Sequence, residues 1–182
     1  GSIPGLRVYL PSDQYLTRAL MNELVADTDP AYIRIGRNAV EDVYEGELTD
    51  FALGKAVRVT DGRDCTVIAC GELVVEAKKA AASLAASGIF VRVLDMYSLK
   101  PLDEEAVLTA AKETKAIVTV EEHARQGGLG SLVAQVLAEK QPARLKSLTL
   151  PDAPVVTGKS ADIFRHYGLD AAGIEKAVRE LI

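Results

Sequence analysis

TVIACGELVVEAKKAAASLAASGIFVRVL, residues 66–94, contains an apolar segment, an amphipathic segment and a second apolar segment in succession. Residues 66–70 and 89–94 are short apolar runs, the second rich in β-branched residues, which is typical of strands buried on both faces. Between them one helical stripe is formed by Leu73, Ala77, Ala80 and Leu84. Gly88 is placed to end that helix in a left-handed conformation. This β-α-β pattern predicts a right-handed crossover between two parallel strands.

The same alternation continues towards the C-terminus. Residues 116–120 and 145–150 are typical of further buried strands, and Asp103 is placed to cap a helix. Another helix is predicted after the glycines near residue 128, and two more, separated by Gly168, end the chain. We therefore predict an α/β fold in which residues 55–182 form a three-layer domain around a mostly parallel sheet. Upstream, Val57 and Val59 alternate with polar residues before a turn at 61–64, which predicts a hairpin with residues 66–70.

The first 37 residues form a smaller unit. They contain two apolar runs, at 6–10 and 32–35, with one amphipathic segment between them. A single β-α-β unit buries too little surface to be stable alone, so we expect it to extend a sheet supplied by other polypeptide. Residues 38–54 are acidic and without regular periodicity, which is typical of a linker. The predicted organisation is thus a partial domain at 1–37, a linker at 38–54 and a full domain at 55–182.

Composition narrows the class of function. The net charge is −5 and no basic run is present, which argues against a nucleic-acid partner. No apolar run approaches the roughly 20 residues that a membrane span needs, and no secretory signal precedes the first strand, so we expect a cytoplasmic protein without a membrane partner. Cys65 and Cys70 would lie on opposite faces of one strand, which excludes a disulfide and favours two buried thiols.

Few residues are candidates for chemistry. His123 follows a predicted strand at the carboxyl edge of the sheet, where α/β folds bind ligands, but a loop histidine bonded to a backbone carbonyl is the more common arrangement. His166 fits a surface or packing position in a terminal helix. The run at 127–131, GGLGS, resembles a phosphate loop but lacks the spacing of the dinucleotide and P-loop motifs. Close packing is the more ordinary use of these glycines.

Arg37 ends the first unit. A guanidinium at the end of a strand can bind a phosphate through two parallel hydrogen bonds. A surface ion pair with Glu41 or Asp42 is the alternative. The position of Arg37 alone leaves both interpretations open.

Six strings in order along the chain resemble the C-terminal half of transketolase: AYIRIGR at 31–37, TVIACG at 66–71, KPLD at 100–103, EEH at 121–123, GGLGS at 127–131 and YGL at 167–169. The resemblance covers nearly the whole chain and is to the thiamine-diphosphate superfamily, above all its short or split transketolases. It implies that residues 1–37 are the remnant of a pyrimidine-binding domain and that residues from about 55 are the transketolase C-terminal domain. Deoxyxylulose-phosphate synthases and 2-oxoacid dehydrogenase beta subunits share these features and are alternatives.

The resemblance also implies a function. The full enzyme would use thiamine diphosphate and Mg²⁺ to move a two-carbon ketol unit between sugar phosphates, as in pentose phosphate metabolism, and would be a homodimer. In this family the diphosphate and metal are held by an N-terminal thiamine-binding domain or subunit, so we expect the isolated chain to bind no cofactor and to be inactive. Arg37 matches the arginine that contacts the substrate phosphate, whereas no role follows for His123 or the 127–131 run. A non-catalytic dimerisation module is the alternative function.

One segment departs from the family. Residues 151–159, PDAPVVTGK, stand where relatives tend to have Phe-Gly and Ser-Gly pairs, so the identity of the sugar is left open. Gly1 and Ser2 resemble a cloning remnant, and we expect the natural polypeptide to extend upstream.

Overall fold

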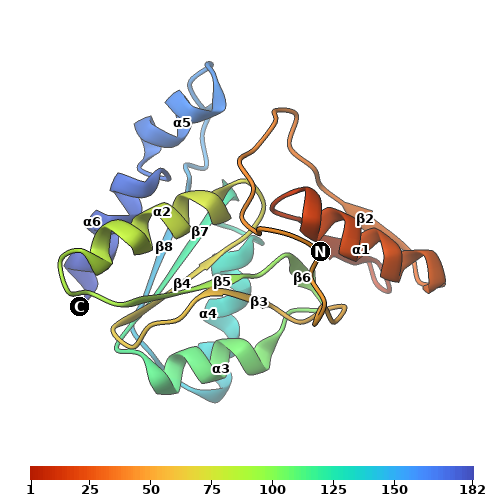
Figure 1. Ribbon diagram of the computed structural model, residues 1–182, viewed down its shortest axis with the longest axis horizontal. Coiled ribbons are helices and arrows are strands. Elements are labelled where there is room, and N and C mark those ends of the chain that lie inside the picture. The colour runs from red at the N-terminus through yellow and green to blue at the C-terminus, as the bar shows by residue number, and fades with distance from the viewer.

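The computed structural model describes residues 1–182 and contains eight strands and six helices (Figure 1). The strands are β1 (Arg7–Tyr9), β2 (Ala31–Ile33), β3 (Val57–Thr60), β4 (Cys65–Ala69), β5 (Val91–Asp95), β6 (Ser98–Lys100), β7 (Ile117–Ala124) and β8 (Leu145–Leu150). The helices are α1 (Gln14–Ala26), α2 (Leu73–Ala85), α3 (Glu104–Glu113), α4 (Leu129–Lys140), α5 (Ser160–Tyr167) and α6 (Ala171–Leu181). None of the six helices combines the length and hydropathy that crossing a membrane requires.

A five-stranded sheet in the order β3-β5-β4-β7-β8 forms the centre of the molecule. Strands β5, β4, β7 and β8 are parallel, and only β3 at one edge is antiparallel. In Figure 1, α2 and α6 cover one face of the sheet while α3 and α4 cover the other. The predicted three-layer α/β fold with a mostly parallel sheet is therefore confirmed.

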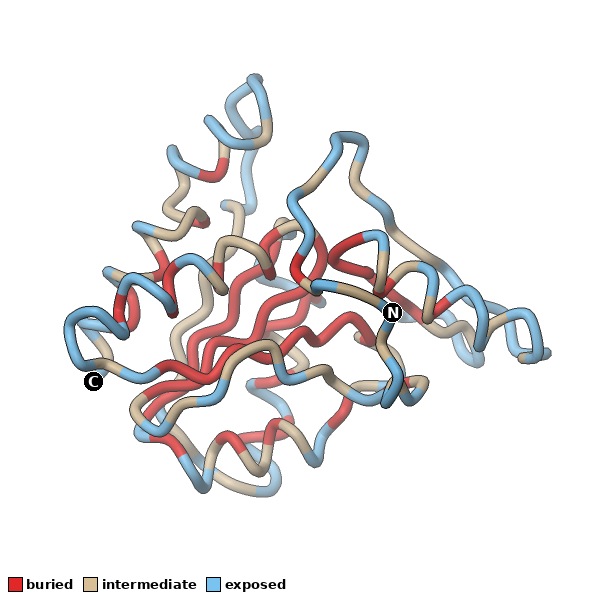
Figure 2. Tube along the Cα trace, viewed as in Figure 1, coloured by how far each residue is buried: buried red, intermediate tan, exposed pale blue.

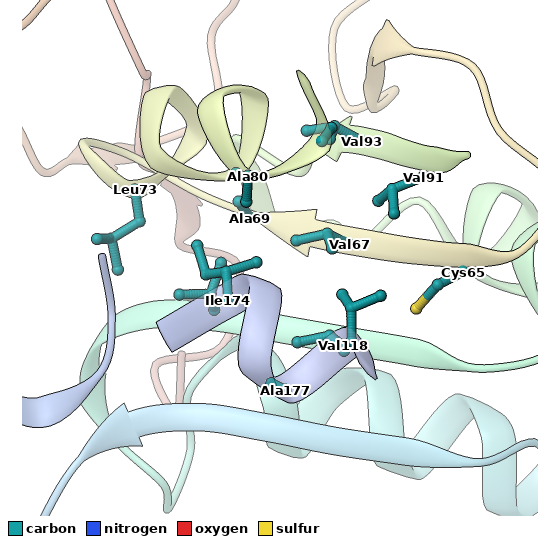
Figure 3. Close-up of a cluster of buried hydrophobic side chains, with 14 of the residues drawn as sticks. Cys65, Val67, Ala69, Leu73, Ala80, Val91, Val93, Val118, Ile174 and Ala177 are labelled. Carbon is teal, nitrogen blue, oxygen red and sulfur yellow. The ribbon is translucent and has the colours of Figure 1, made fainter. Parts of the chain in front are cut away.

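The core is divided by the sheet because side chains alternate along each strand. Val67 of β4 packs with α2 and α6 on one face, whereas its neighbour Ile68 packs with α3 and α4 on the other. Figure 2 shows the central strands buried along their length, and Figure 3 shows Val67 beside Val118 and Ile174. The same alternation places Cys65 and the residue after β4, Cys70, in different clusters, so both are free buried thiols, as predicted.

The predicted hairpin between β3 and β4 is wrong. β3 pairs with β5 instead, with Val57 opposite Asp95, so β5 lies between the two strands. The turn crosses the start of β5 at Gly62, where an added Cβ would lie 2.3 Å from the backbone carbon of Val91. Only glycine permits this close approach, so Gly62 is compatible with a chain that passes across β5.

Local signals at the helix ends agree with the structure. The carboxylate of Asp103 accepts a hydrogen bond from the backbone N–H of Ala106 and so caps α3. Gly88 and Gly168 both adopt left-handed backbone conformations, with φ of 78° and 67°. These two glycines follow α2 and α5, as the sequence predicted.

The N-terminal unit forms a second, three-stranded sheet in the order β2-β1-β6. β1 and β2 are parallel, and β6, which follows β5 of the main sheet along the chain, adds to β1 in the antiparallel sense. Residues 38–54 form no helix or strand, but Asp13 anchors them by accepting hydrogen bonds from the backbone of Val43 and Tyr44, at 2.8 and 3.0 Å. The division into three segments remains a prediction.

Candidate functional site

Charged side chains gather where β2, β4 and β7 end. Arg34, one residue beyond β2, pairs with Glu122 of β7 at 2.7 Å. This ion pair links the N-terminal unit to the main sheet and raises the pKa of Arg34 against the opposing effect of burial. Glu72, which follows β4, packs against Gly36, where an added Cβ would lie 1.6 Å from a carboxylate oxygen. Partial burial raises the pKa of Glu72, and the neighbouring Glu122 raises it further.

Two cavities lie on either side of residues 38–40. The smaller, of about 460 Å³, opens beside the start of α1 and is lined by Asp13 and Arg18, among others. The larger, of about 880 Å³, lies between the linker, α2 and the start of α5, and Arg37 lines it. Both cavities share Glu72 as a wall.

Arg37 is exposed and forms no ion pair within 4.0 Å. The two carboxylates that were candidates to neutralise it are engaged elsewhere. Glu41 pairs with Lys79 at 2.7 Å, and Asp42 accepts hydrogen bonds from Gln14. The guanidinium of Arg37 is therefore available to an anion in the larger cavity.

Backbone N–H groups of the glycine run at 127–131 already donate hydrogen bonds to a side chain of the same chain. Glu121, with a side chain that is almost fully buried, accepts hydrogen bonds from the backbone of Leu129 at 2.6 Å and Gly130 at 2.8 Å. Burial raises the pKa of Glu121, and these N–H donors act against that rise. Gly130 also packs against β8, where an added Cβ would lie 2.6 Å from the hydroxyl of Ser147. The run thus serves close packing, and its helix N-terminus already holds a carboxylate.

Neither histidine lines one of the two cavities. His123 is exposed, and its Nδ1 lies 2.7 Å from the backbone carbonyl of Ala124, the common arrangement anticipated for it. His166 is also exposed and packs edge-on against the ring of Tyr167.

A buried carboxyl group that the sequence did not single out lies at the end of β5. Asp95 is fully buried, and one carboxylate oxygen accepts hydrogen bonds from Ser12 at 2.5 Å and Tyr44 at 2.9 Å. Its other oxygen has no partner. Burial raises the pKa of Asp95 to about 7, and the nearby Asp13 raises it as well. An aspartate closing an apolar strand is the only sequence signal for this group, and it is weak.

The residues present do not fit a bound diphosphate with its metal. No group of three or more His, Cys, Asp or Glu is arranged to hold a metal ion. The glycine-rich helix start, which would otherwise offer backbone N–H groups to a phosphate, is filled by Glu121.

Comparison with known proteins agrees with the resemblance noted in the sequence. Residues 54–174 match the family model described as transketolase, C-terminal domain. The chain is 48% identical over 181 residues to an apulose-4-phosphate transketolase subunit of Phocaeicola vulgatus, covering all of this chain and 58% of that protein. It is 38% identical over 180 residues to the 6-deoxy-6-sulfo-D-fructose transketolase subunit SqwH of a Clostridium species, covering 99% of this chain and 56% of that one.

More distant relatives and a solved structure extend the comparison. A 1-deoxy-D-xylulose-5-phosphate synthase of Geobacter sulfurreducens is 34% identical over 99% of this chain and 29% of its own length. Among solved structures, a split gene transketolase, an inactive beta4 tetramer, superposes with a TM-score of 0.88 at 36% identity, covering 99% of this chain and 58% of that chain. The chain thus spans little more than half the length of the transketolase subunits that it matches.

Proposed function

The chain belongs to the transketolase C-terminal domain family, and from this membership we propose that it is the C-terminal part of a thiamine-diphosphate-dependent transketolase. The enzyme moves a two-carbon ketol unit between sugar phosphates. This chain alone is inactive, because thiamine diphosphate and Mg²⁺ are held by a separate N-terminal thiamine-binding domain or subunit. The single observation that carries the proposal is the identity of 48% and 38%, over nearly the whole chain, to subunits of two transketolases.

The role of Arg37 in this enzyme is to hold the phosphate of the sugar. Three features support that role: the guanidinium is exposed, it has no carboxylate partner, and it lines a cavity of about 880 Å³. A planar guanidinium can donate two parallel hydrogen bonds to a phosphate, which orients the substrate as well as binding it. The chain contributes positioning, whereas the bond-making chemistry belongs to the cofactor on the partner.

The proposal includes the organisation of the whole protein. Residues 1–37 are the end of a pyrimidine-binding domain, residues 38–54 a linker and residues 55–182 the C-terminal domain. The start of the family match at residue 54 supports this division. We place the enzyme in the cytoplasm as a homodimer, and pentose phosphates or related sugar phosphates are its substrates.

A deoxyxylulose-phosphate synthase is the second candidate, because the chain is 34% identical to such an enzyme over 99% of its length. The higher identity to transketolase subunits favours ketol transfer. A module that only dimerises, without contacting substrate, and a 2-oxoacid dehydrogenase beta subunit are the remaining alternatives.

The test uses the complete subunit that contains this chain, coexpressed with the thiamine-binding subunit or domain and supplied with thiamine diphosphate and Mg²⁺. Ketol transfer is assayed with a panel of sugar phosphates, and pyruvate is offered as donor to detect synthase activity. Failure to transfer a ketol unit from any sugar phosphate would contradict the proposal.

Arg37→Ala tests the assigned residue in the same assay. Hydrogen bonds to a charged group contribute about 1.5–3 kcal/mol, so kcat/KM for phosphorylated substrates should fall about 10- to 100-fold, mainly through KM. Arg144→Ala, at another exposed arginine without an ion pair, is the matched control. An unchanged KM together with weaker subunit association would instead favour the dimerisation module.

A further inference from the structure

The end of the segment at residues 151–159 contributes to the wall of the larger cavity opposite the linker. Residues 151–159 are all exposed, and Gly158 and Lys159 line the same cavity as Arg37. Lys159 immediately precedes α5, whose first residue is Ser160. In Figure 1, α5 and the linker both rise above α2 on the upper side of the molecule.

One hydrogen bond joins the two walls. The side-chain amide of Asn38 donates to the hydroxyl of Ser160 at 3.0 Å. Asn38 is the chain neighbour of Arg37, and Ser160 is the chain neighbour of Lys159. The bond therefore joins the segments that carry Arg37 and Lys159, and both of these residues line the same cavity.

The cationic side chains that line the larger cavity fall into two groups, those with an ion pair and those without one. Lys79 is neutralised by Glu41 and Glu76, and Arg165 pairs with Asp162 at 3.1 Å. Arg37 and Lys159, by contrast, form no ion pair within 4.0 Å.

The carboxylates in the lining are also engaged within the fold. Asp170 caps α6 by accepting from the backbone of Gly173, and Glu76 accepts from the backbone of Ala171 in addition to pairing with Lys79. Glu72 packs against Gly36. The lining thus holds four cationic and four anionic side chains, and Arg37 and Lys159 are the two cations among them that form no ion pair.

We propose that Lys159 is a second residue that binds the phosphate group of the sugar substrate, acting with Arg37 from the opposite wall of the cavity. This inference rests on the proposed function for the identity of the ligand. A phosphate monoester carries close to two negative charges at neutral pH, so it gains from a second cation beside the arginine. Arginine fixes the orientation of the phosphate, and lysine supplies a mobile point charge.

The direct test is a calorimetric titration of the assembled holoenzyme with inorganic phosphate. It is carried out for the wild type, Lys159→Ala and Arg37→Ala. Lys112→Ala, an exposed lysine on α3 without an ion pair, is the matched control. We expect Lys159→Ala to raise the Kd for phosphate about 5- to 20-fold, Lys159→Arg to restore most of the affinity, and Lys112→Ala to have no effect. Because Lys159 is exposed, the variants should melt at the wild-type temperature.

Kinetics give the second readout. Lys159→Ala should raise KM for the sugar phosphate by a similar factor and leave kcat within about twofold. The inference is overturned if Lys159→Ala binds phosphate and sugar phosphate as the wild type does while Arg37→Ala is impaired, and the proposed function then still stands. If no sugar phosphate is turned over at all, the proposed function fails, and the phosphate titration still decides whether Lys159 and Arg37 share an anion.

Discussion

Replacing Asp95 with asparagine should make the stability of this protein less dependent on pH. Asp95 is fully buried at the end of β5, where it accepts hydrogen bonds from Ser12 and Tyr44 through one oxygen and leaves the other without a partner. Burial raises its pKa from 3.8 to about 7. The folded protein therefore binds a proton that the unfolded chain releases at lower pH.

The sign and size of the effect follow from that difference. A raised carboxyl pKa favours the folded state most below pH 3.8, and the advantage is lost as the pH rises through about 7. At about 1.4 kcal/mol for each pH unit, the full difference corresponds to about 4 kcal/mol. Between about pH 5 and pH 8, this one group should lower the free energy of unfolding by about 3 kcal/mol.

The assay is urea unfolding of the wild type and Asp95→Asn at both pH values. The amide of the variant affects the free energy of unfolding equally at both pH values. The difference in this free energy between the wild type and the variant therefore changes with pH only through the carboxyl group of Asp95. Asp152→Asn, at an exposed aspartate, controls for the loss of one negative charge. If the difference between wild type and Asp95→Asn is the same at both pH values, within about 1 kcal/mol, the reasoning from burial is wrong.

Two further predictions concern packing and the link between the two parts of the chain. Gly130→Ala should lower the free energy of unfolding by about 1–3 kcal/mol, because the new Cβ would lie 2.6 Å from the hydroxyl of Ser147. The control Gly46→Ala has open space around the new Cβ and should unfold like the wild type. Equal stability of the two variants in urea unfolding would contradict this prediction. A double-mutant cycle with Arg34→Ala and Glu122→Ala should give a coupling energy below about 1 kcal/mol, because both side chains are partly exposed, and a value above about 2 kcal/mol would show that the pair is more important than its exposure indicates.

The candidate site was only partly predictable from sequence. Arg37 could be singled out because a guanidinium at a strand end is a recognisable phosphate ligand and the surrounding string resembles a known family. The resemblance offered nothing for Lys159, because this residue lies outside the six strings that carry it. Its place beside Arg37 depends on the contact between Asn38 and Ser160, and no local pattern encodes a contact between residues so far apart.

Glu121 illustrates the opposite case. The glycines that follow it resembled a phosphate loop, but their spacing did not match the known motifs, and close packing was the more ordinary interpretation. The structure adds the physical reason, which is that a buried carboxylate of the same chain occupies the N–H groups of Leu129 and Gly130. A sequence pattern identifies the donors of a helix N-terminus, but the acceptor comes from another element.

The sequence alone determined most of the helices and strands of this protein and their layering, whereas β6 was not predicted from it. Continuous apolar runs, helical stripes, the Asp103 cap and the left-handed glycines act over a few residues, so a linear pattern encodes them directly. The neighbour of each strand was decided only by the tertiary structure. β3 pairs with β5, and the backbone at Gly62 passes close to Val91; Asp95 is buried beneath Ser12, which precedes α1, and Tyr44 of residues 38–54. Both outcomes depend on packing between segments distant in sequence, which a periodic pattern does not specify.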